Sequence, residues 1–168
     1  MAIIGIVAVD KNGAIGKDGR LPWHYAADLR FFKGQTIHHA CVMGQRTWRS
    51  LKQPLKERLN IVLSRSSSET AETQESVVVL KDRQSVLSLV PYLACDVFII
   101  GGAQIFRAFQ NNIERWVVTE VPLSVEGADT LMPKDYLQGF KAVDSLSLEE
   151  NLKVTFYERS VEPSPPNV

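Results

Sequence analysis

The sequence has few cysteines and no excess of charge of either sign. Cys41 and Cys95 are the only cysteines among 168 residues, and their spacing matches no metal-ligand motif. Each lies in or beside an apolar run, so we predict two buried, reduced thiols, as suits a reducing cytosol. Nineteen basic residues balance nineteen acidic ones, so no overall field attracts nucleic acid or an anionic membrane. We therefore predict no metal site and no nucleic-acid partner.

Long hydrophobic runs are also absent from the sequence. The N-terminus has no basic stretch before an apolar core and no small-residue cleavage site, so we expect no signal peptide. No apolar run approaches the roughly 20 residues that span a bilayer. These absences predict a cytoplasmic protein without membrane contact.

What is present fits one globular domain. Hydrophobic residues make up 45% and charged residues 23%, an ordinary balance for a folded domain. We expect this domain over residues 1–160 and a disordered tail over residues 161–168, which hold three prolines. The chain shows no internal repeat, exposed heptad or broad apolar stripe, so we expect a monomer.

Short apolar runs alternate with helical patterns along the first two thirds of the chain. Gly34 is expected to end the first helix, Asp82 to cap the third, and segments 10–22 and 65–76 to form loops. The pattern predicts an α/β fold: a central, mostly parallel sheet with an antiparallel C-terminal edge strand and helices on both faces. Predicted strands cover residues 3–9, 40–43, 60–63, 77–80, 97–100, 116–121, 140–147 and 153–159; predicted helices cover 26–33 and 44–51 and follow Asp82 and Gly102.

Asp28 is the first candidate for chemistry. It lies four residues before Phe32, and Leu29 three residues before it, so all three share a helix face. Desolvation by apolar neighbours favours the neutral acid and raises its pKa. Such a carboxyl could hydrogen-bond the amidine-like edge of a heterocycle and stabilise positive charge on it. The alternative is an ordinary aspartate near the positive end of the helix dipole.

Three further motifs lie where predicted strands end, which is where open α/β sheets bind ligands. Gly44-Gln45-Arg46-Thr47 and Gly101-Gly102-Ala103-Gln104 each open a helix, whose first N–H groups can bind phosphate. Leu63-Ser64-Arg65 offers a hydroxyl and a guanidinium that suit a phosphate monoester. The paired glycines do not form a GxGxxG fingerprint, which argues against a Rossmann domain. Taken singly, each motif has an ordinary alternative: a capped surface helix at Gly44, a simple structural turn at Gly101-Gly102 and a solvated turn at Ser64-Arg65.

Taken together, these segments resemble the dihydrofolate reductase family. They occur in the family's order and near its spacing, and the likeness runs from Ile3 to about Arg159. The resemblance implies a sheet of about eight strands with four flanking helices, NADPH across the carboxyl edge of the sheet, and a cis peptide between Gly101 and Gly102. The matching segments are residues 15–23, 27–29, 42–48, 54–55, 58, 60–65, 99–106 and 126–130.

The resemblance also implies an activity: reduction of 7,8-dihydrofolate to tetrahydrofolate by NADPH, for one-carbon metabolism and thymidylate synthesis. Asp28 would bind the 2-amino and N3 edge of the pteridine, with Thr119 in support. Arg58 would bind the α-carboxylate of the glutamate tail, a geometry that guanidinium suits. The remaining substrate-binding positions would be Ile6, Val7, Ala8, Leu29, Phe32, Leu51, Leu55 and Ile100.

The same resemblance makes residues 12–23 a lid over the reacting rings. Leu21 would close over the nicotinamide, and Trp23 would complete the catalytic set. The backbones of Ala8 and Ile15 would hold the nicotinamide carboxamide. Hydride would reach C6 of the substrate, with a proton on N5.

The phosphates of NADPH would be held at the strand ends. Arg46, Ser64 and Arg65 resemble the 2′-phosphate site, and Thr47 with residues 102–105 the pyrophosphate site. The whole predicted cofactor set is Ala8, Ile15, Gly16, Lys17, Asp18, Gly19, Leu21, Gly44, Gln45, Arg46, Thr47, Leu63, Ser64, Arg65, Lys81, Ile100, Gly101, Gly102, Ala103, Gln104, Ile105 and Phe106.

The chain departs from the family pattern in four places. Gln45 stands where arginine is frequent, which shifts phosphate binding onto the remaining arginines. Tyr25 and Ala26 replace Leu-Pro, which loosens the expected start of the helix. Phe106 lacks the hydroxyl of a common tyrosine near the nicotinamide. Ala128 adds a residue to a loop that supports the lid in the family.

Two alternative functions stay open. One is a related NADPH enzyme for another pyrimidine or pterin, such as a riboflavin-pathway reductase, against which Asp28, Phe32 and Arg58 together argue. The other is a binding module without catalysis, against which the complete acid, lid and cofactor set argues. For the reductase, antifolates such as trimethoprim and methotrexate are expected ligands.

Overall fold

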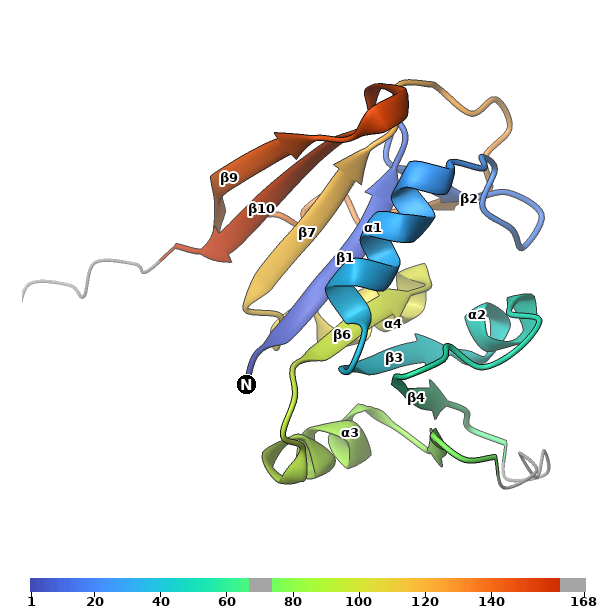
Figure 1. Cartoon of the computed structure of the whole chain (residues 1–168), viewed down its shortest axis with the longest axis vertical. Coiled ribbons are helices and arrows are strands. Elements are labelled where there is room, and N and C mark those ends of the chain that lie inside the picture. Colours follow the sequence, from blue (N-terminus) through green and yellow to red (C-terminus); the bar gives the residue numbers. More distant parts are fainter. Residues whose placement is uncertain (67–73, 161–168) are drawn as a thin grey trace, which may run out of the picture.

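An eight-stranded sheet forms the centre of the molecule, in a computed structural model that describes residues 1–66 and 74–160. The strand order is β5-β4-β3-β6-β1-β7-β10-β9 (Figure 1). Neighbours from β5 to β7 are parallel, whereas β10 pairs antiparallel with β7 and β9 antiparallel with β10. The predicted fold class is therefore confirmed. The predicted disordered tail and part of the predicted loop 65–76 lie outside the described residues.

All eight predicted strands and all four predicted helices are present. None of the helices in the described residues combines the length and the hydropathy of a membrane span. The strands of the large sheet are β1 (Ile3–Val9), β3 (Ala40–Gly44), β4 (Leu59–Leu63), β5 (Val77–Leu80), β6 (Val97–Gly101), β7 (Arg115–Glu120), β9 (Phe140–Ser147) and β10 (Lys153–Arg159). The helices are α1 (Ala26–Thr36), α2 (Gln45–Ser50), α3 (Arg83–Leu89) and α4 (Ala103–Phe109), with 3₁₀ turns η1 (Val90–Tyr92) and η2 (Glu149–Asn151).

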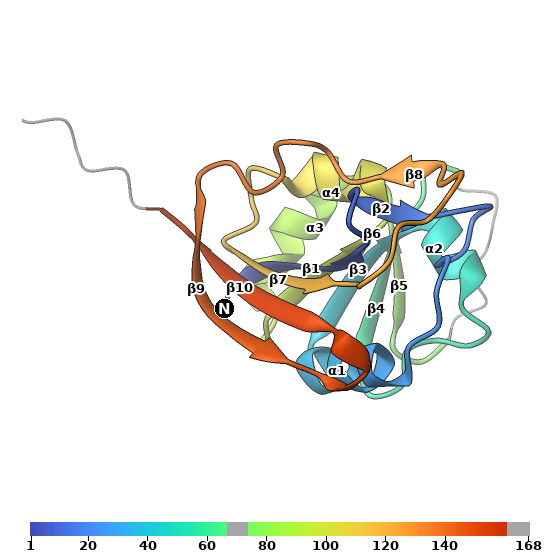
Figure 2. The same ribbon diagram turned by 90° about the horizontal axis from the view of Figure 1, so that it is seen from above.

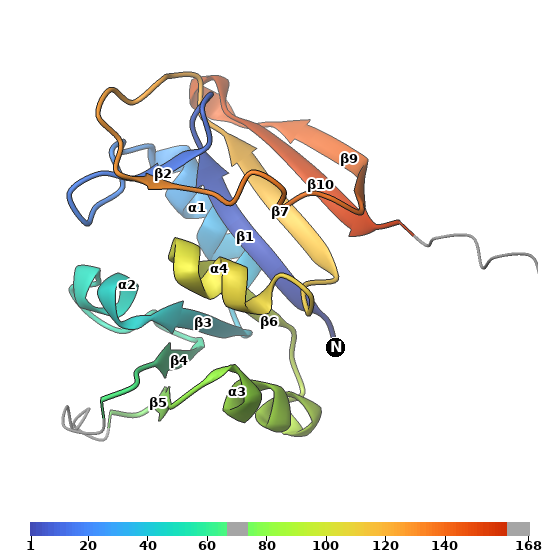
Figure 3. The same cartoon turned by 180° about the vertical axis from the view of Figure 1, so that it is seen from behind.

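Helices cover both faces of the sheet, as the apolar strands predict. Figures 2 and 3 show α1 on one face and α3 and α4 on the other. Successive residues of β1 serve both layers: Ile4 and Ile6 pack into the cluster on the α1 side, and Ile3 and Val7 into the opposite one. A central parallel strand is buried on both faces, so it is apolar throughout rather than alternating.

Two sequence-based expectations about local structure are wrong. Gly34 does not end α1, which continues to Thr36, whose Oγ1 donates a hydrogen bond to the Phe32 carbonyl. An exposed helical glycine costs only about 1 kcal/mol, which tertiary packing readily offsets. The expected loop 10–22 contains a short strand, β2 (Ala14–Gly16), which pairs with β8 (Thr130–Leu131). Strands this short carry no periodic signal.

Of two other local expectations, one is confirmed and one is partly wrong. Asp82 caps α3, because its Oδ1 accepts from the backbone N–H of Ser85 at 2.8 Å. Cys41 and Cys95 are both free, and Cys41 is fully buried, but Cys95 is half-exposed, which corrects the expectation of two buried thiols. Cys95 lies two residues before β6, which begins with the buried Val97.

Gly5 in the middle of β1 leads to a stability prediction. A Cβ at this position would lie 2.4 Å from two ring carbons of Trp116, which is 1% exposed and packed against Phe106 and Tyr136. We expect Gly5→Ala to lower the free energy of unfolding by about 1–3 kcal/mol, because the ring cannot yield. Urea denaturation measures the change.

Gly34→Ala is the matched control for this prediction. A Cβ at Gly34 meets nothing within 4 Å, so the same substitution is expected to raise the free energy of unfolding by up to about 1 kcal/mol. Equal effects of the two substitutions would contradict the packing argument.

Candidate active site

The predicted apolar walls of the folate site come together on the α1 side of the sheet. Ile6 from β1 belongs to the same cluster as Phe32 from α1. Leu51 and Leu55, which follow α2, and Ile100 near the end of β6 pack against this cluster. Five side chains from four parts of the chain therefore form one apolar surface.

Asp28 lies in the first turn of α1, half-buried beside β7. Burial raises the pKa of its carboxyl above the ordinary value, and a hydrogen bond with the Thr119 side chain acts in the opposite direction. Thr119 is 3% exposed and pairs with Ala8 in the register of β7 against β1. An aspartate that only interacted with the positive end of the helix dipole would have a lowered pKa. The structure therefore favours a desolvated acid over an ordinary aspartate at a helix start.

The start of α1 is held by a residue that sequence analysis missed. The N-cap position, Tyr25, supplies no side-chain cap. Instead, Glu150 from the turn between β9 and β10 accepts from the backbone N–H of Ala27 at 3.3 Å. Arg30 and Glu149 add an exposed ion pair of 2.9 Å between the same segments. The β9–β10 turn thus supports the helix start that the missing proline was expected to loosen.

This contact leads to a second prediction. Glu150→Ala is expected to lower the free energy of unfolding by about 0.5–1 kcal/mol, since a first-turn N–H loses its acceptor. Amide exchange at Ala27 should accelerate, whereas Glu150→Gln, which keeps an acceptor oxygen, should lose less. Arg30→Ala removes only the exposed ion pair and should change stability by less than about 0.5 kcal/mol. A loss in Glu150→Ala no larger than in Arg30→Ala would refute the capping role.

Arg58 is a buried cation without a counter-charge among the residues that the structure describes. Its side chain is 8% exposed, its Nε donates to the Lys56 carbonyl at 2.9 Å, and its Nη1 donates to Thr36 Oγ1 at 3.0 Å. No carboxylate of the described residues lies within ion-pair distance of it. A buried charge without a partner is costly, and the Nη2 donors, which bond to none of the described residues, suit a carboxylate ligand.

Asn60 fixes the turn that carries Leu55 and Arg58. Its Oδ1 accepts from the backbone N–H of Leu55 at 2.9 Å, and its Nδ2 donates to the carbonyls of Leu55 and Arg58, both at 3.0 Å. Asn60 is fully buried at the start of β4. The side-chain amide of Asn60 therefore fixes the positions of Leu55 and Arg58 relative to the sheet.

The paired glycines and Gly44 lie beside one another at the carboxyl ends of β6 and β3. The Gly101–Gly102 peptide is cis, as the resemblance implies. A Cβ on Gly44 would lie 3.0 Å from the Ile105 side chain, so any larger residue would require Ile105 to shift. A Cβ on Gly102 would meet nothing within 4 Å, which leaves open space above the turn.

Basic side chains surround the ends of the neighbouring strands. Ser64 follows β4 and donates its backbone N–H to the Leu80 carbonyl at 3.0 Å, so Ser64 and Lys81 lie side by side. Arg46, Arg65 and Lys81 are exposed. Hydroxyl and cationic groups at this edge suit phosphate.

Two predicted contact residues pack on the opposite face from the apolar walls, and a third is exposed. Val7 packs into the cluster on the opposite face, so only its backbone can face the folate side. Phe106 is 3% exposed, with its ring against Trp116 and Gly101, so it supports the glycine turn from the core. Leu29 is 47% exposed and belongs to the rim.

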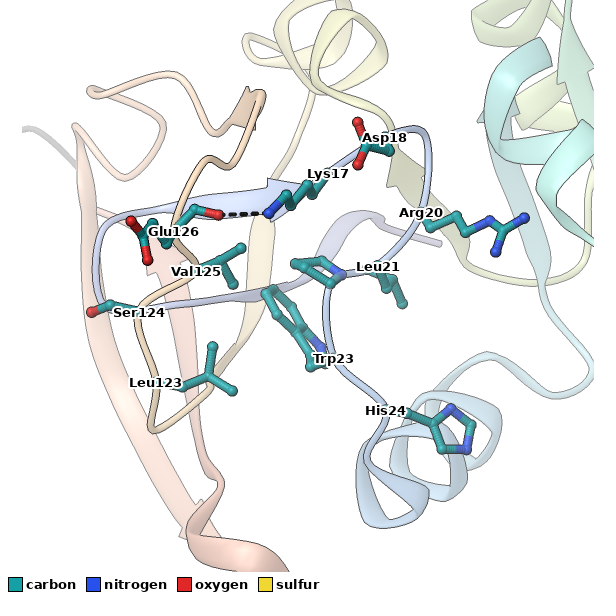
Figure 4. Close-up of a pocket in the computed structure, with 11 residues that line it drawn as sticks. Lys17, Asp18, Arg20, Leu21, Trp23, His24, Leu123, Ser124, Val125 and Glu126 are labelled. Atoms are coloured by element: carbon teal, nitrogen blue, oxygen red, sulfur yellow. Dashed lines mark hydrogen bonds between the residues drawn. The ribbon is translucent and has the colours of Figure 1, made fainter.

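The predicted lid is fastened to the loop between β7 and β8. Lys17 Nζ donates to the Glu126 carbonyl at 2.9 Å, and the backbone N–H of Asp18 donates to Asp129 Oδ2 at 2.7 Å. Figure 4 shows Lys17 reaching across to Glu126. The contact between Asp18 and Asp129 is therefore present even though Ala128, just before Asp129, adds a residue to the loop.

Two lid residues from the predicted catalytic set differ in exposure. Leu21 is 54% exposed, whereas Trp23 is 9% exposed and packs with Ala27 and Val121. The indole Nε1 of Trp23 is buried without a hydrogen-bond partner among the described residues. A buried N–H of this kind is normally satisfied by an ordered water or a ligand.

A cavity of about 1000 Å³ lies between the lid and the β7–β8 loop (Figure 4). Asp28 and Arg58 do not line it, so it is the space between two loops rather than the folate pocket. Its lining includes four residues that sequence analysis did not single out, since no local pattern marks them. The lining residues are Lys17, Asp18, Arg20, Leu21, Pro22, Trp23, His24, Leu123, Ser124, Val125 and Glu126.

Comparison with known proteins gives consistent matches. The family model described as dihydrofolate reductase matches residues 2–160. The dihydrofolate reductases of Haemophilus influenzae and Mycobacterium leprae are 33% and 40% identical; the alignments cover 77% and 79% of this chain and 77% and 82% of those proteins. A solved structure, dihydrofolate reductase from Enterococcus faecalis complexed with NADP(H) and RAB-propyl, superimposes with a TM-score of 0.85 at 28% identity. It covers 95% of this chain and 97% of that one.

Longer relatives match as well. A bifunctional dihydrofolate reductase-thymidylate synthase of Glycine max is 43% identical over 145 residues, which are 76% of this chain and 27% of that protein. The chain thus spans about a quarter of the length of such bifunctional relatives.

Proposed function

The chain belongs to the dihydrofolate reductase family, and from this premise we propose that it reduces 7,8-dihydrofolate to tetrahydrofolate with NADPH. The observation that carries the proposal is Asp28: a half-buried carboxyl of raised pKa that lies next to the Thr119 side chain and beside an apolar surface. The product would supply one-carbon metabolism and thymidylate synthesis.

The pteridine ring fits between Asp28 and the apolar walls. The carboxyl accepts hydrogen bonds from the 2-amino and N3 edge, and Thr119 fixes the carboxyl from β7. Phe32 and Ile100 pack against the ring, while the Leu29 side chain covers the outer part of the substrate. An amidine edge and a carboxylate form a bidentate, charge-assisted pair, the strong type of hydrogen bond in proteins.

The residues at the strand ends fit NADPH. The open space above Gly102 leaves room for a pyrophosphate against the turn, and the donor set at the neighbouring strand ends is cationic and hydroxylic. Arg46, Ser64 and Arg65 would hold the 2′-phosphate, and the backbones of Ala8 and Ile15 the nicotinamide carboxamide. When bound there, NADPH supplies the hydride.

The protein's part in the reaction is electrostatic and positional. Protonation of substrate N5 makes C6 an electrophilic iminium carbon, and Asp28 stabilises that cation. A water held at the unpartnered indole N–H of Trp23 provides a route for the proton. Leu21 closes over the reacting rings and excludes bulk water. Holding the two rings in register contributes a further large share of the rate.

We further propose a cytoplasmic monomer whose catalytic domain is residues 1–160. The two free cysteines suit a reducing compartment. Trimethoprim and methotrexate, whose diamino rings present the same amidine edge, would compete for Asp28.

A spectrophotometric assay tests the proposal. Loss of NADPH absorbance should depend on dihydrofolate and stop when methotrexate is added. A substrate panel containing riboflavin-pathway pyrimidines should show no turnover. Tight NADPH binding without transfer to any pterin would instead support the binding module and refute the reductase.

A further inference from the structure

Asp10 is a buried carboxyl that the proposed reaction does not use. It follows β1 directly and is 4% exposed. Its Oδ1 accepts from the backbone N–H groups of Asn12 and Ala14, both at 2.8 Å, and its Oδ2 from that of Val125 at 2.7 Å. Burial acts to raise the pKa of Asp10, but these three hydrogen bonds outweigh it and hold the pKa below the ordinary value.

The three donors come from two separate segments. Asn12 and Ala14 begin the lid, whereas Val125 belongs to the β7–β8 loop, 115 residues after Asp10. A backbone hydrogen bond of 3.0 Å from Lys11 to the Leu123 carbonyl runs beside this contact. One side chain therefore joins the base of the lid to the loop on the other side of the cavity.

Backbone bonds also join this region to the lid: the Asp129 N–H donates to the Gly16 carbonyl at 3.3 Å, and β2 pairs with β8. The other side-chain contacts between the two segments differ from those of Asp10. The bonds from Lys17 to Glu126 and from Asp18 to Asp129 are exposed, so water competes for both partners. Asp10 alone among these groups is buried. Water therefore competes less for its bonds than for the two exposed contacts.

We propose that Asp10 is a positioning residue for hydride transfer: it fixes the base of the lid to the β7–β8 loop and so sets where Ile15 and Leu21 meet the nicotinamide. The inference rests on the proposed function. It assigns no contact with substrate or cofactor to Asp10, which acts through the lid backbone alone.

Two substitutions separate the parts of this role. In Asp10→Asn, one acceptor oxygen becomes an NH₂ donor. This donor would face a backbone N–H, with which it cannot form a hydrogen bond. Asp10→Ser keeps a hydroxyl that can serve the adjacent turn but is too short to reach Val125. We expect both to slow single-turnover hydride transfer at least tenfold while methotrexate affinity, measured without NADPH, stays within twofold.

Asp96→Asn is the matched control. Asp96 also accepts a long-range backbone N–H, from Ala2 at 2.8 Å, but at the amino ends of β1 and β6, away from the lid. Its hydride-transfer rate should stay within twofold of the wild type. Equal slowing in Asp96→Asn, or slowing matched by lost methotrexate affinity, would show general destabilisation and overturn the proposal.

Amide hydrogen exchange over residues 12–23, measured without ligand, gives an independent readout. Faster exchange in Asp10→Ser than in Asp96→Asn supports the role, and unchanged exchange overturns it, even if Asp10→Asn does not fold. If the wild type fails to reduce dihydrofolate, the proposed function fails, and the exchange result still decides whether Asp10 holds the lid.

Discussion

Replacing Asp28 by asparagine is expected to lower the hydride-transfer rate at pH 7 by about 10²- to 10⁴-fold. The amide has nearly the same shape and can still accept a hydrogen bond from the 2-amino group. It carries no charge, so it cannot stabilise a cation that develops at N5. Single-turnover measurements with NADPH and dihydrofolate report the rate, and Asp144→Asn, on the exposed strand β9, should leave it unchanged.

The pH dependence separates this role from a loss of binding. In the wild type, Asp28 and the pteridine share one proton, so the rate should be constant at low pH and fall as that proton is lost. Because burial raises the pKa of Asp28, the fall should begin above the ordinary range for an aspartate. The Asp28→Asn variant has no such group, so its rate should keep rising as pH falls. A parallel profile in both proteins would refute the assigned role.

The same substitution should not destabilise the fold. The pKa of Asp28 is higher in the folded protein than in the unfolded chain, so the folded state binds more protons between the two values. Stability therefore falls as pH rises through that window, and at pH 7 the charged side chain bears the full desolvation cost. The melting temperature of Asp28→Asn at pH 7 should equal or exceed that of the wild type. A large decrease would mean that inactivity reflects unfolding.

The features that sequence analysis predicted correctly are those with local signals. Residues 3–9 are apolar throughout because β1 is buried on both faces, and Asp28 stands out because helical spacing places it beside Phe32. The Gly101–Gly102 pair marks a turn that other residues cannot adopt. Each signal depends on neighbours within a few residues in the sequence, so it can be recognised without knowledge of the fold.

The features that sequence analysis missed depend on residues far apart in the chain. Glu150 supports α1 across 123 residues, and Asp10 reaches Val125 across 115. The β2–β8 pair joins segments too short to show a period. The ring of Phe106 packs against Trp116, a residue ten positions later in the chain. Contacts of this kind are decided by tertiary packing, which no local pattern encodes.

Arg58→Met is expected to raise the KM for dihydrofolate at least 100-fold with little change in kcat. The Arg58 guanidinium is buried, and the described residues provide no carboxylate to balance its charge, so the proposed α-carboxylate would be its partner. Loss of one member of a buried, hydrogen-bonded charge pair costs about 2–5 kcal/mol of binding. Steady-state kinetics at saturating NADPH measure the split between KM and kcat.

Substrate truncation provides the control for this prediction. Dihydropteroate has the pteridine and benzoyl groups but no glutamate, so wild type and Arg58→Met should reduce it with equal kcat/KM. Arg58→Lys keeps the charge but offers only a point donor in place of a fork, and should recover part of the affinity for dihydrofolate. Because an unpaired buried cation is costly, Arg58→Met should unfold no more readily than the wild type. If Arg58→Met lowers kcat/KM for dihydropteroate as much as for dihydrofolate, Arg58 acts on the ring or on the fold. Its assignment to the glutamate tail is then wrong.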